Sequence, residues 1–95
     1  MESVDEMANV FKALSDPTRL RLLTLLGGGQ TLCVNALARK LGVTQSAVSQ
    51  HLRVLKQAGL VVGSREGSFI HYSLKTDRLT TYQNWLTKTL GDKRL

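Results

Sequence analysis

Apolar side chains recur along this chain at intervals of three and four residues, the spacing that gathers them on one face of an α-helix. In the first segment they are Met7, Val10, Phe11 and Leu14, which predicts a helix over about residues 4–14. The next run, LRLLTLL, follows Asp16 and Pro17, a capping residue and a residue that suits the first helical position. This run stops at three consecutive glycines, so a second helix is expected between these two signals.

Two further helices are predicted on either side of Gly42. The first is expected to begin near Thr31 or Leu32 and to end at Leu41. Its apolar stripe consists of Val34, Leu37, Ala38 and Leu41. Gly42 permits a left-handed turn, and Thr44 suits the N-cap of the next helix, over residues 45–58.

The segment after Gly59 has the composition of β-strands. LVVGSR and FIHYSL are short and rich in β-branched and aromatic residues, and EGS between them supplies a turn, which predicts a β-hairpin. A last helix over about residues 77–91 follows from the spacing of Leu79, Tyr82, Leu86 and Leu90. The expected fold is therefore mainly α, of the α+β class, with four helices, a hairpin and a fifth helix.

Two helices joined by a short turn containing glycine match the plan of a helix-turn-helix. In the second of these helices Val48, Leu52 and Leu55 share one face, which must point to the core. The opposite face can form hydrogen bonds and contains no acid; its members are Ser46, Ser49, Gln50, Arg53 and Gln57. Surface helices usually mix Glu with Lys, so this face favours DNA recognition over an ordinary solvated surface.

The expected DNA contacts differ along this helix and in the hairpin. The N-terminal part of a recognition helix points at base edges. Base contacts are therefore expected from Gln45, Ser46, Ser49 and Gln50. Contacts that position the helix are expected from Thr44, Arg53 and Lys56, and contacts from the hairpin tip are expected from Arg65 and Ser68.

The formal net charge of +6 is unevenly distributed over the chain. The first 30 residues carry −1, residues 31–78 carry +5 and the last 17 residues carry +2. The excess of Lys and Arg thus coincides with the predicted helix-turn-helix and hairpin. Because cations that neutralise phosphates release counterions, this segment suits a polyanion, and double-stranded DNA is the expected partner.

Composition and motifs exclude several other classes. Ninety-five residues with 42% hydrophobic and 21% charged side chains suit one globular domain, residues 1–95. The densest apolar run, LRLLTLL, is far shorter than the ~20 residues that span a bilayer, and MESVDEM does not resemble a signal peptide. With one cysteine, a cytoplasmic protein without a membrane partner is expected. Without a G-x-S-x-G, P-loop or HExxH motif, an enzyme is not expected.

Three blocks of the chain resemble successive blocks of the ArsR (arsenic-repressor-like) family of bacterial winged-helix repressors. These blocks are ALSDPTRLRLLTLL, LCVNALARKLGVTQSAVSQHLRVLKQAGLV and REGSFIHYSL. The resemblance implies a winged helix-turn-helix, a homodimer whose first and last helices pack across a two-fold axis, and repression from an inverted-repeat operator. The apolar faces of residues 4–14 and 77–91 suit such an interface, but in a monomer they could equally close the core.

Cys33 is the only cysteine, and its role stays open at this point. Arsenic-sensing members of the family carry two cysteines one residue apart in the block that LCVNALA resembles, whereas the second position here is Asn35, a poor ligand for As(III) or Zn(II). A second family site uses carboxylates and histidines on the last helix, which here has no histidine and only the widely spaced Asp77 and Asp92. No metal site or cofactor is therefore expected.

Two alternatives to a plain repressor remain. One is a thiol-redox or metal-responsive repressor that senses through Cys33, which is otherwise a small structural residue. The other is a protein-interaction module, which salt-dependent DNA binding would exclude. The histidines are not expected to be ligands: His51 lies toward the core side of its helix, and of His71 and Tyr72 one is expected to face the core and the other solvent.

Overall fold

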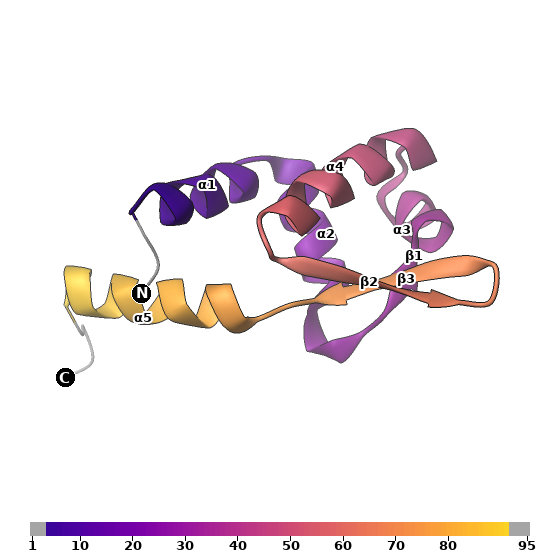
Figure 1. Ribbon diagram of the computed structural model, residues 1–95. Helices are drawn as coiled ribbons and strands as arrows, with labels where there is room; N and C mark the ends of the chain where they lie inside the picture. Colours follow the sequence, from indigo (N-terminus) through magenta and orange to yellow (C-terminus); the bar gives the residue numbers. More distant parts are fainter. Residues whose placement is uncertain (1–3, 92–95) are drawn as a thin grey trace.

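The computed structural model describes residues 4–91, which form five α-helices, a single turn of 3-10 helix and a small antiparallel sheet (Figure 1). In chain order the elements are α1 (Val4–Leu14), α2 (Pro17–Leu26), η1 (Gly27–Gly29), β1 (Leu32–Cys33), α3 (Val34–Leu41), α4 (Gln45–Gln57), β2 (Val61–Glu66), β3 (Phe69–Leu74) and α5 (Asp77–Leu90). The predicted order of helices and hairpin is confirmed. No helix of residues 4–91 has the length and apolar character needed to cross a membrane.

Capping interactions explain why the helices begin and end where they do. The Asp16 side chain accepts a hydrogen bond from the Arg19 N–H at 3.0 Å, and Pro17 occupies the first helical position of α2. Gly42 ends α3 in the left-handed conformation, with φ 69° and ψ 33°. Thr44 Oγ1 then accepts from the Ala47 N–H at 3.0 Å and starts α4. All of these signals are local in the sequence.

The predicted start of the third helix was wrong. Instead of beginning near Thr31 or Leu32, α3 begins at Val34, because Leu32–Cys33 form the short strand β1. This strand pairs with β3, where Leu32 lies opposite Tyr72 and Cys33 opposite His71. The sheet therefore has three strands in the order β1-β3-β2, and the predicted hairpin is its β2–β3 part.

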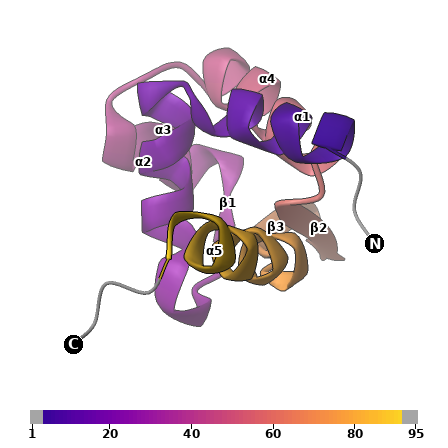
Figure 2. The ribbon, with the colours of Figure 1, turned by 90° about the vertical axis from the view of Figure 1, so that its left-hand side faces the viewer.

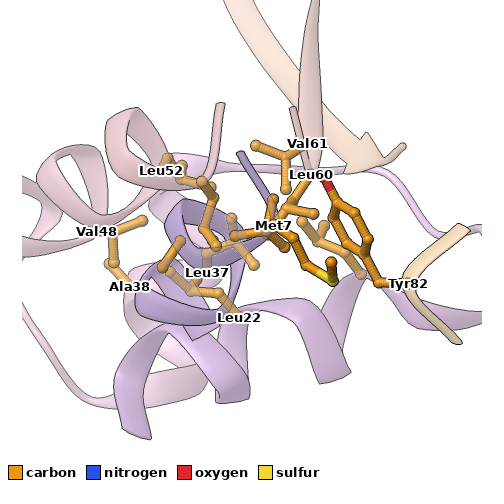
Figure 3. Packing of buried hydrophobic residues seen from close by; sticks show 13 residues of the cluster. Met7, Leu22, Leu37, Ala38, Val48, Leu52, Leu60, Val61 and Tyr82 are labelled. Carbon is orange, nitrogen blue, oxygen red and sulfur yellow. The ribbon is translucent and has the colours of Figure 1, made fainter. Parts of the chain in front are cut away.

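The core lies where α2 meets the inner faces of α1, α3 and α4 (Figure 3). Its fully buried side chains are Leu22, Leu26, Leu37, Leu52, Leu55, Leu60, Val10 and Val48. Three of these, Val48, Leu52 and Leu55, are the residues that the helical spacing assigned to the core face of α4. That prediction is confirmed, so the opposite face of α4 must point outward.

The terminal helices α1 and α5 lie at the end of the molecule away from the hairpin tip (Figures 1 and 2). Tyr82 is the buried residue of α5, and the centroid of its ring lies 6.0 Å from the ring centroid of Phe11 on α1. Other apolar residues of these two helices stay exposed: Val4, Phe11, Trp85, Leu86 and Leu90. One part of these helices therefore closes the core through Tyr82, and another part is uncovered. Whether the uncovered part forms a dimer interface stays a prediction.

Candidate nucleic-acid interface

The outward face of α4 is fully open to solvent. Each predicted contact residue of this segment is exposed: Thr44, Gln45, Ser46, Ser49, Gln50, Arg53 and Lys56. The turn before the helix fixes this orientation, since the N–H groups of Gly42 and Val43 both donate to the Ala38 carbonyl, at 2.9 and 3.2 Å. Amide, hydroxyl and guanidinium groups without a carboxylate form a surface that can donate to DNA bases and phosphates.

The β2–β3 hairpin extends beyond α3 as a wing (Figure 1). Its register pairs Val61 with Leu74, Gly63 with Tyr72 and Arg65 with Ile70, so these residues share one face of the hairpin. Val61 is buried at the helix side, which puts the exposed Arg65 on the helix-facing side beyond the edge of the core. Ser68 is exposed at the tip, after Gly67 makes the turn with φ 64°.

Two hollows join α4 to the wing. One, of about 310 Å³, is lined by Ser49 of α4, Ser68, Phe69, Ile70 and Tyr72 of the wing, and Cys33, Val34 and Asn35 at the start of α3. The other, of about 230 Å³, is lined by Ser49, Leu52, Arg53, Lys56 and Tyr72. Of the predicted DNA contacts, Ser49 and Ser68 thus meet around one hollow, and Arg53 and Lys56 around its neighbour.

The sequence prediction missed part of this surface. Asn35, Phe69 and Ile70 line the larger hollow but were not named as candidates. The alternation of a strand could have placed Ile70 on the same face as Tyr72. Asn35 carried no such signal, because its position depends on β1, which brings the start of α3 beside β3.

The two histidines lie on different elements, and each is half-buried. His51 is half-buried, and its Nδ1 lies 3.3 Å from Arg19 Nη1 and 3.9 Å from Asp16 Oδ2, in keeping with a packed role. Tyr72 packs against the core, as was expected of one residue of this pair, whereas His71 is half-buried and not open to solvent as was expected of the other. The cause is partly β1, which covers the edge of β3, and partly Glu66, whose Oε2 lies 3.2 Å from His71 Nδ1.

Asp16 is the titratable group with a shifted pKa beside α4. The hydrogen bond from the Arg19 backbone N–H, with a smaller contribution from the positive charge of Arg19, holds the pKa of the Asp16 carboxyl below its ordinary value of 3.8. The carboxyl therefore remains ionised at neutral pH, where it caps α2 and faces His51.

Cys33 lies at the junction of β1 and α3, half-buried and with a free thiol. It is the N-cap of α3 but its side chain makes no capping hydrogen bond. Within residues 4–91 the structure brings together no group of three or more Cys, His, Asp and Glu side chains that could hold a metal ion. Asp92, the second acid considered near the last helix, lies outside the described residues.

Comparison with known proteins identifies the family. The model of bacterial regulatory proteins of the arsR family matches residues 16–62. The transcriptional repressor SdpR of Bacillus subtilis (strain 168) is 44% identical over 91 residues, which cover 94% of this chain and 100% of SdpR. This chain belongs to the ArsR family. It is a DNA-binding transcriptional repressor with a winged helix-turn-helix, and not an enzyme.

Solved structures of ArsR-like regulators share the fold. The ArsR-like transcriptional regulator from Rhodococcus sp. RHA1 superposes with a TM-score of 0.83 and 35% identity, over 90% of this chain and 77% of that one. A homodimeric winged helix-turn-helix DNA-binding domain from Mycobacterium bovis, a possible ArsR-family regulator, gives a TM-score of 0.74 and 33% identity, over 97% of this chain and 83% of that one. The arrangement of α3, α4 and the wing is therefore that of an ArsR-family protein.

Proposed function

We propose that this chain represses transcription as a homodimer that binds an inverted-repeat operator through α4 and the wing. The observation that carries the proposal is the outward face of α4, which is exposed, rich in hydrogen-bonding groups and free of acid. In a major groove such a face meets acceptors and donors of base edges, and a carboxylate would be repelled by the phosphates.

The proposed contacts divide into three groups. Gln45, Ser46, Ser49 and Gln50, in the first half of α4, read base edges. Thr44, Arg53 and Lys56 hold the helix against the phosphate backbone, and Arg65 and Ser68 support it from the wing. The two hollows between α4 and the wing support a joint role for these two elements, because Ser49 lines both hollows and Ser68 of the wing lines one of them.

The homodimer is proposed to form through the terminal helices of a single domain spanning residues 1–95. Trp85 and Leu86 are 42% and 38% exposed and Leu90 is 65% exposed, although all three are large and apolar. The Mycobacterium bovis relative is homodimeric. A two-fold axis between the terminal helices would present two copies of α4 to half-sites about 34–36 Å apart, which requires an inverted repeat.

No resident metal or cofactor is part of this proposal. Asn35 stands where arsenic-sensing relatives carry a second thiolate, and the last helix has no histidine. We infer that the repressor does not release DNA through the usual metal sites of the family. Since its target is DNA, it acts in the cytoplasm.

A second candidate is a repressor that senses through Cys33, by thiol oxidation or by binding a metal. The observation in its favour is that Cys33 lines the same hollow as Ser49 and Ser68. A modified thiol there would change the space between α4 and the wing. If Cys33→Ser protein still releases its operator under oxidant or Zn(II), this candidate is excluded.

Fluorescence anisotropy tests both candidates. The chain is titrated against its own upstream promoter region and against random DNA, at several salt concentrations, with and without a thiol oxidant or Zn(II). Tight binding to the promoter and a steep fall of affinity with salt are expected, and nuclease footprinting of the same promoter is expected to show two symmetric half-sites. Equal, salt-independent affinity for both DNAs would contradict repression and favour a protein-interaction module.

A further inference from the structure

Arg19 is the residue through which α1, α2 and α4 meet. Its Nε donates to the Ala13 carbonyl at 2.6 Å, and its Nη2 donates to the Lys12 carbonyl at 3.5 Å, both near the end of α1. Its Nη1 lies 3.3 Å from Nδ1 of His51 on α4. The Arg19 backbone N–H, in turn, is held by the Asp16 carboxylate at 3.0 Å.

The two contacts to α1 fix the plane of the guanidinium. The last carbonyls of a helix have no partner within the helix, and a cation placed there also interacts favourably with the helix dipole. A guanidinium is a rigid planar fork, so once two of its nitrogens are bound the direction of the third is determined. Arg19 Nη1 is therefore directed from the end of α1 toward His51, whose Nδ1 also lies 3.9 Å from the Asp16 carboxylate.

His51 lies on the flank of α4, between the buried face of Val48 and Leu52 and the outward face of Gln50. Apolar contacts determine which side of α4 faces the core, but they are non-directional and permit small rotations about the helix axis. A hydrogen bond to the flank is directional and removes that freedom. Rotation of α4 would turn every side chain of its outward face relative to the DNA.

We propose that Arg19 is a positioning residue for DNA recognition, which fixes the rotation of α4 through His51 and so aims Ser49 and Gln50 at the base edges. The inference rests on the proposed function. It also gives the end of α1 a defined link to the recognition helix of the same protomer. Arg19 itself touches no base, since its guanidinium is engaged by the carbonyls of α1 and by His51.

Charge-conserving variants separate positioning from electrostatics. Arg19→Lys keeps the positive charge but loses the fork, and His51→Ala removes the acceptor at the other end. Arg21→Lys, an exposed arginine on the same helix, is the matched control. Each variant is titrated by anisotropy against operator and random DNA, with concentrations corrected for the folded fraction from urea unfolding.

Arg19→Lys and His51→Ala are each expected to weaken operator binding about fivefold, the effect of losing one ordinary hydrogen bond, without changing the affinity for random DNA. The double variant is expected to be no weaker than either single variant, because both changes break the same contact. Arg21→Lys is expected to match the wild-type chain. If Arg19→Lys does not fold, His51→Ala alone carries the comparison.

Three results would overturn the inference: equal losses on operator and random DNA, no loss on either, or additive losses in the double variant. A wild-type chain that does not prefer its operator would contradict the proposed function instead. Amide hydrogen exchange then tests the contact without DNA. Faster exchange in α4 is expected for Arg19→Lys and His51→Ala but not for Arg21→Lys, and unchanged exchange in α4 would overturn the role of Arg19.

Discussion

Helices α4 and α5 are both amphipathic, but the chain covers their apolar faces to different extents. In α4 the residues Val48, Leu52 and Leu55 are at most 1% exposed. In α5 Tyr82 is 3% exposed, whereas Trp85, Leu86 and Leu90 are 38 to 65% exposed. The side that α4 leaves open is mainly polar and without acid, whereas α5 leaves three large apolar side chains exposed among its polar ones.

This difference indicates what each helix is built to meet. An open polar face with positive charge suits a polyanion, because the phosphates replace water and counterions. An open apolar face suits a protein surface, because burial removes apolar area from water. We therefore propose that α4 serves DNA binding and that α5 serves assembly of the dimer.

The largest expected effect is on assembly. Leu86→Glu should separate the proposed dimer and leave each protomer folded. Each protomer would place an unpaired carboxylate in an apolar interface at a cost of about 2 kcal/mol, which over two copies raises the dissociation constant about a thousandfold. Sedimentation equilibrium measures this change. Gln83→Glu, an exposed polar position on the same helix, is the control, and an unchanged dimer in Leu86→Glu would contradict the role given to α5.

A substitution in the core face of α4 should instead lower the stability of each protomer. Leu52→Ala should lower the free energy of unfolding by about 3 kcal/mol, because the side chain is buried and its removal leaves a cavity. Urea unfolding at fixed protein concentration measures the loss. The Val54 side chain on the same helix is 37% exposed, so Val54→Ala should lower the free energy of unfolding by less than about 1 kcal/mol. Similar losses for both variants would show that α4 does not pack as described.

The starts of the two helices offer a smaller contrast. Thr44 caps α4 through its hydroxyl, whereas Thr76, the N-cap of α5, makes no side-chain capping hydrogen bond. Thr44→Ala should therefore cost about 1 kcal/mol of stability, and Thr76→Ala only a few tenths. If urea unfolding shows the same loss of stability for both variants, the difference between the two caps is contradicted.

The smallest effect concerns the carboxyl beside α4. The pKa of Asp16 is lowered in the folded state, so its contribution to stability is complete above the ordinary value of 3.8 and is lost as the pH falls through the folded value. Stability should decline on acidification below that value. The decline should be shallower in Asp16→Asn, which keeps a capping oxygen but does not titrate. If wild type and Asp16→Asn lose stability equally as the pH falls, measured by urea unfolding, the lowered pKa of Asp16 is contradicted.

The parts of this structure that sequence could predict are those with local causes. Asp16, Gly42 and Thr44 mark helix ends through capping interactions that span only a few residues. The spacing of Val48, Leu52 and Leu55 likewise determined which side of α4 faces outward. These signals were sufficient to nominate the residues of the proposed DNA surface.

The missed parts depend on residues that are distant in the sequence. Strand β1 has two residues and exists because β3 pairs with it, so Leu32–Cys33 carry no strand signal of their own. The hollow that joins Asn35 to Ile70 follows from that pairing. Arg19 and His51 meet across 32 positions of the chain, and neither residue type indicates the other.

Base reading by α4 is tested most directly by comparing Gln50→Ala with wild type on the operator and on random DNA. A loss of about 1–3 kcal/mol on the operator, with no change on random DNA, is expected for Gln50→Ala. Arg65→Ala, as the companion variant on the wing, should weaken binding to both DNAs and flatten the salt dependence. Equal losses on both DNAs for Gln50→Ala would contradict base recognition by the outward face of α4.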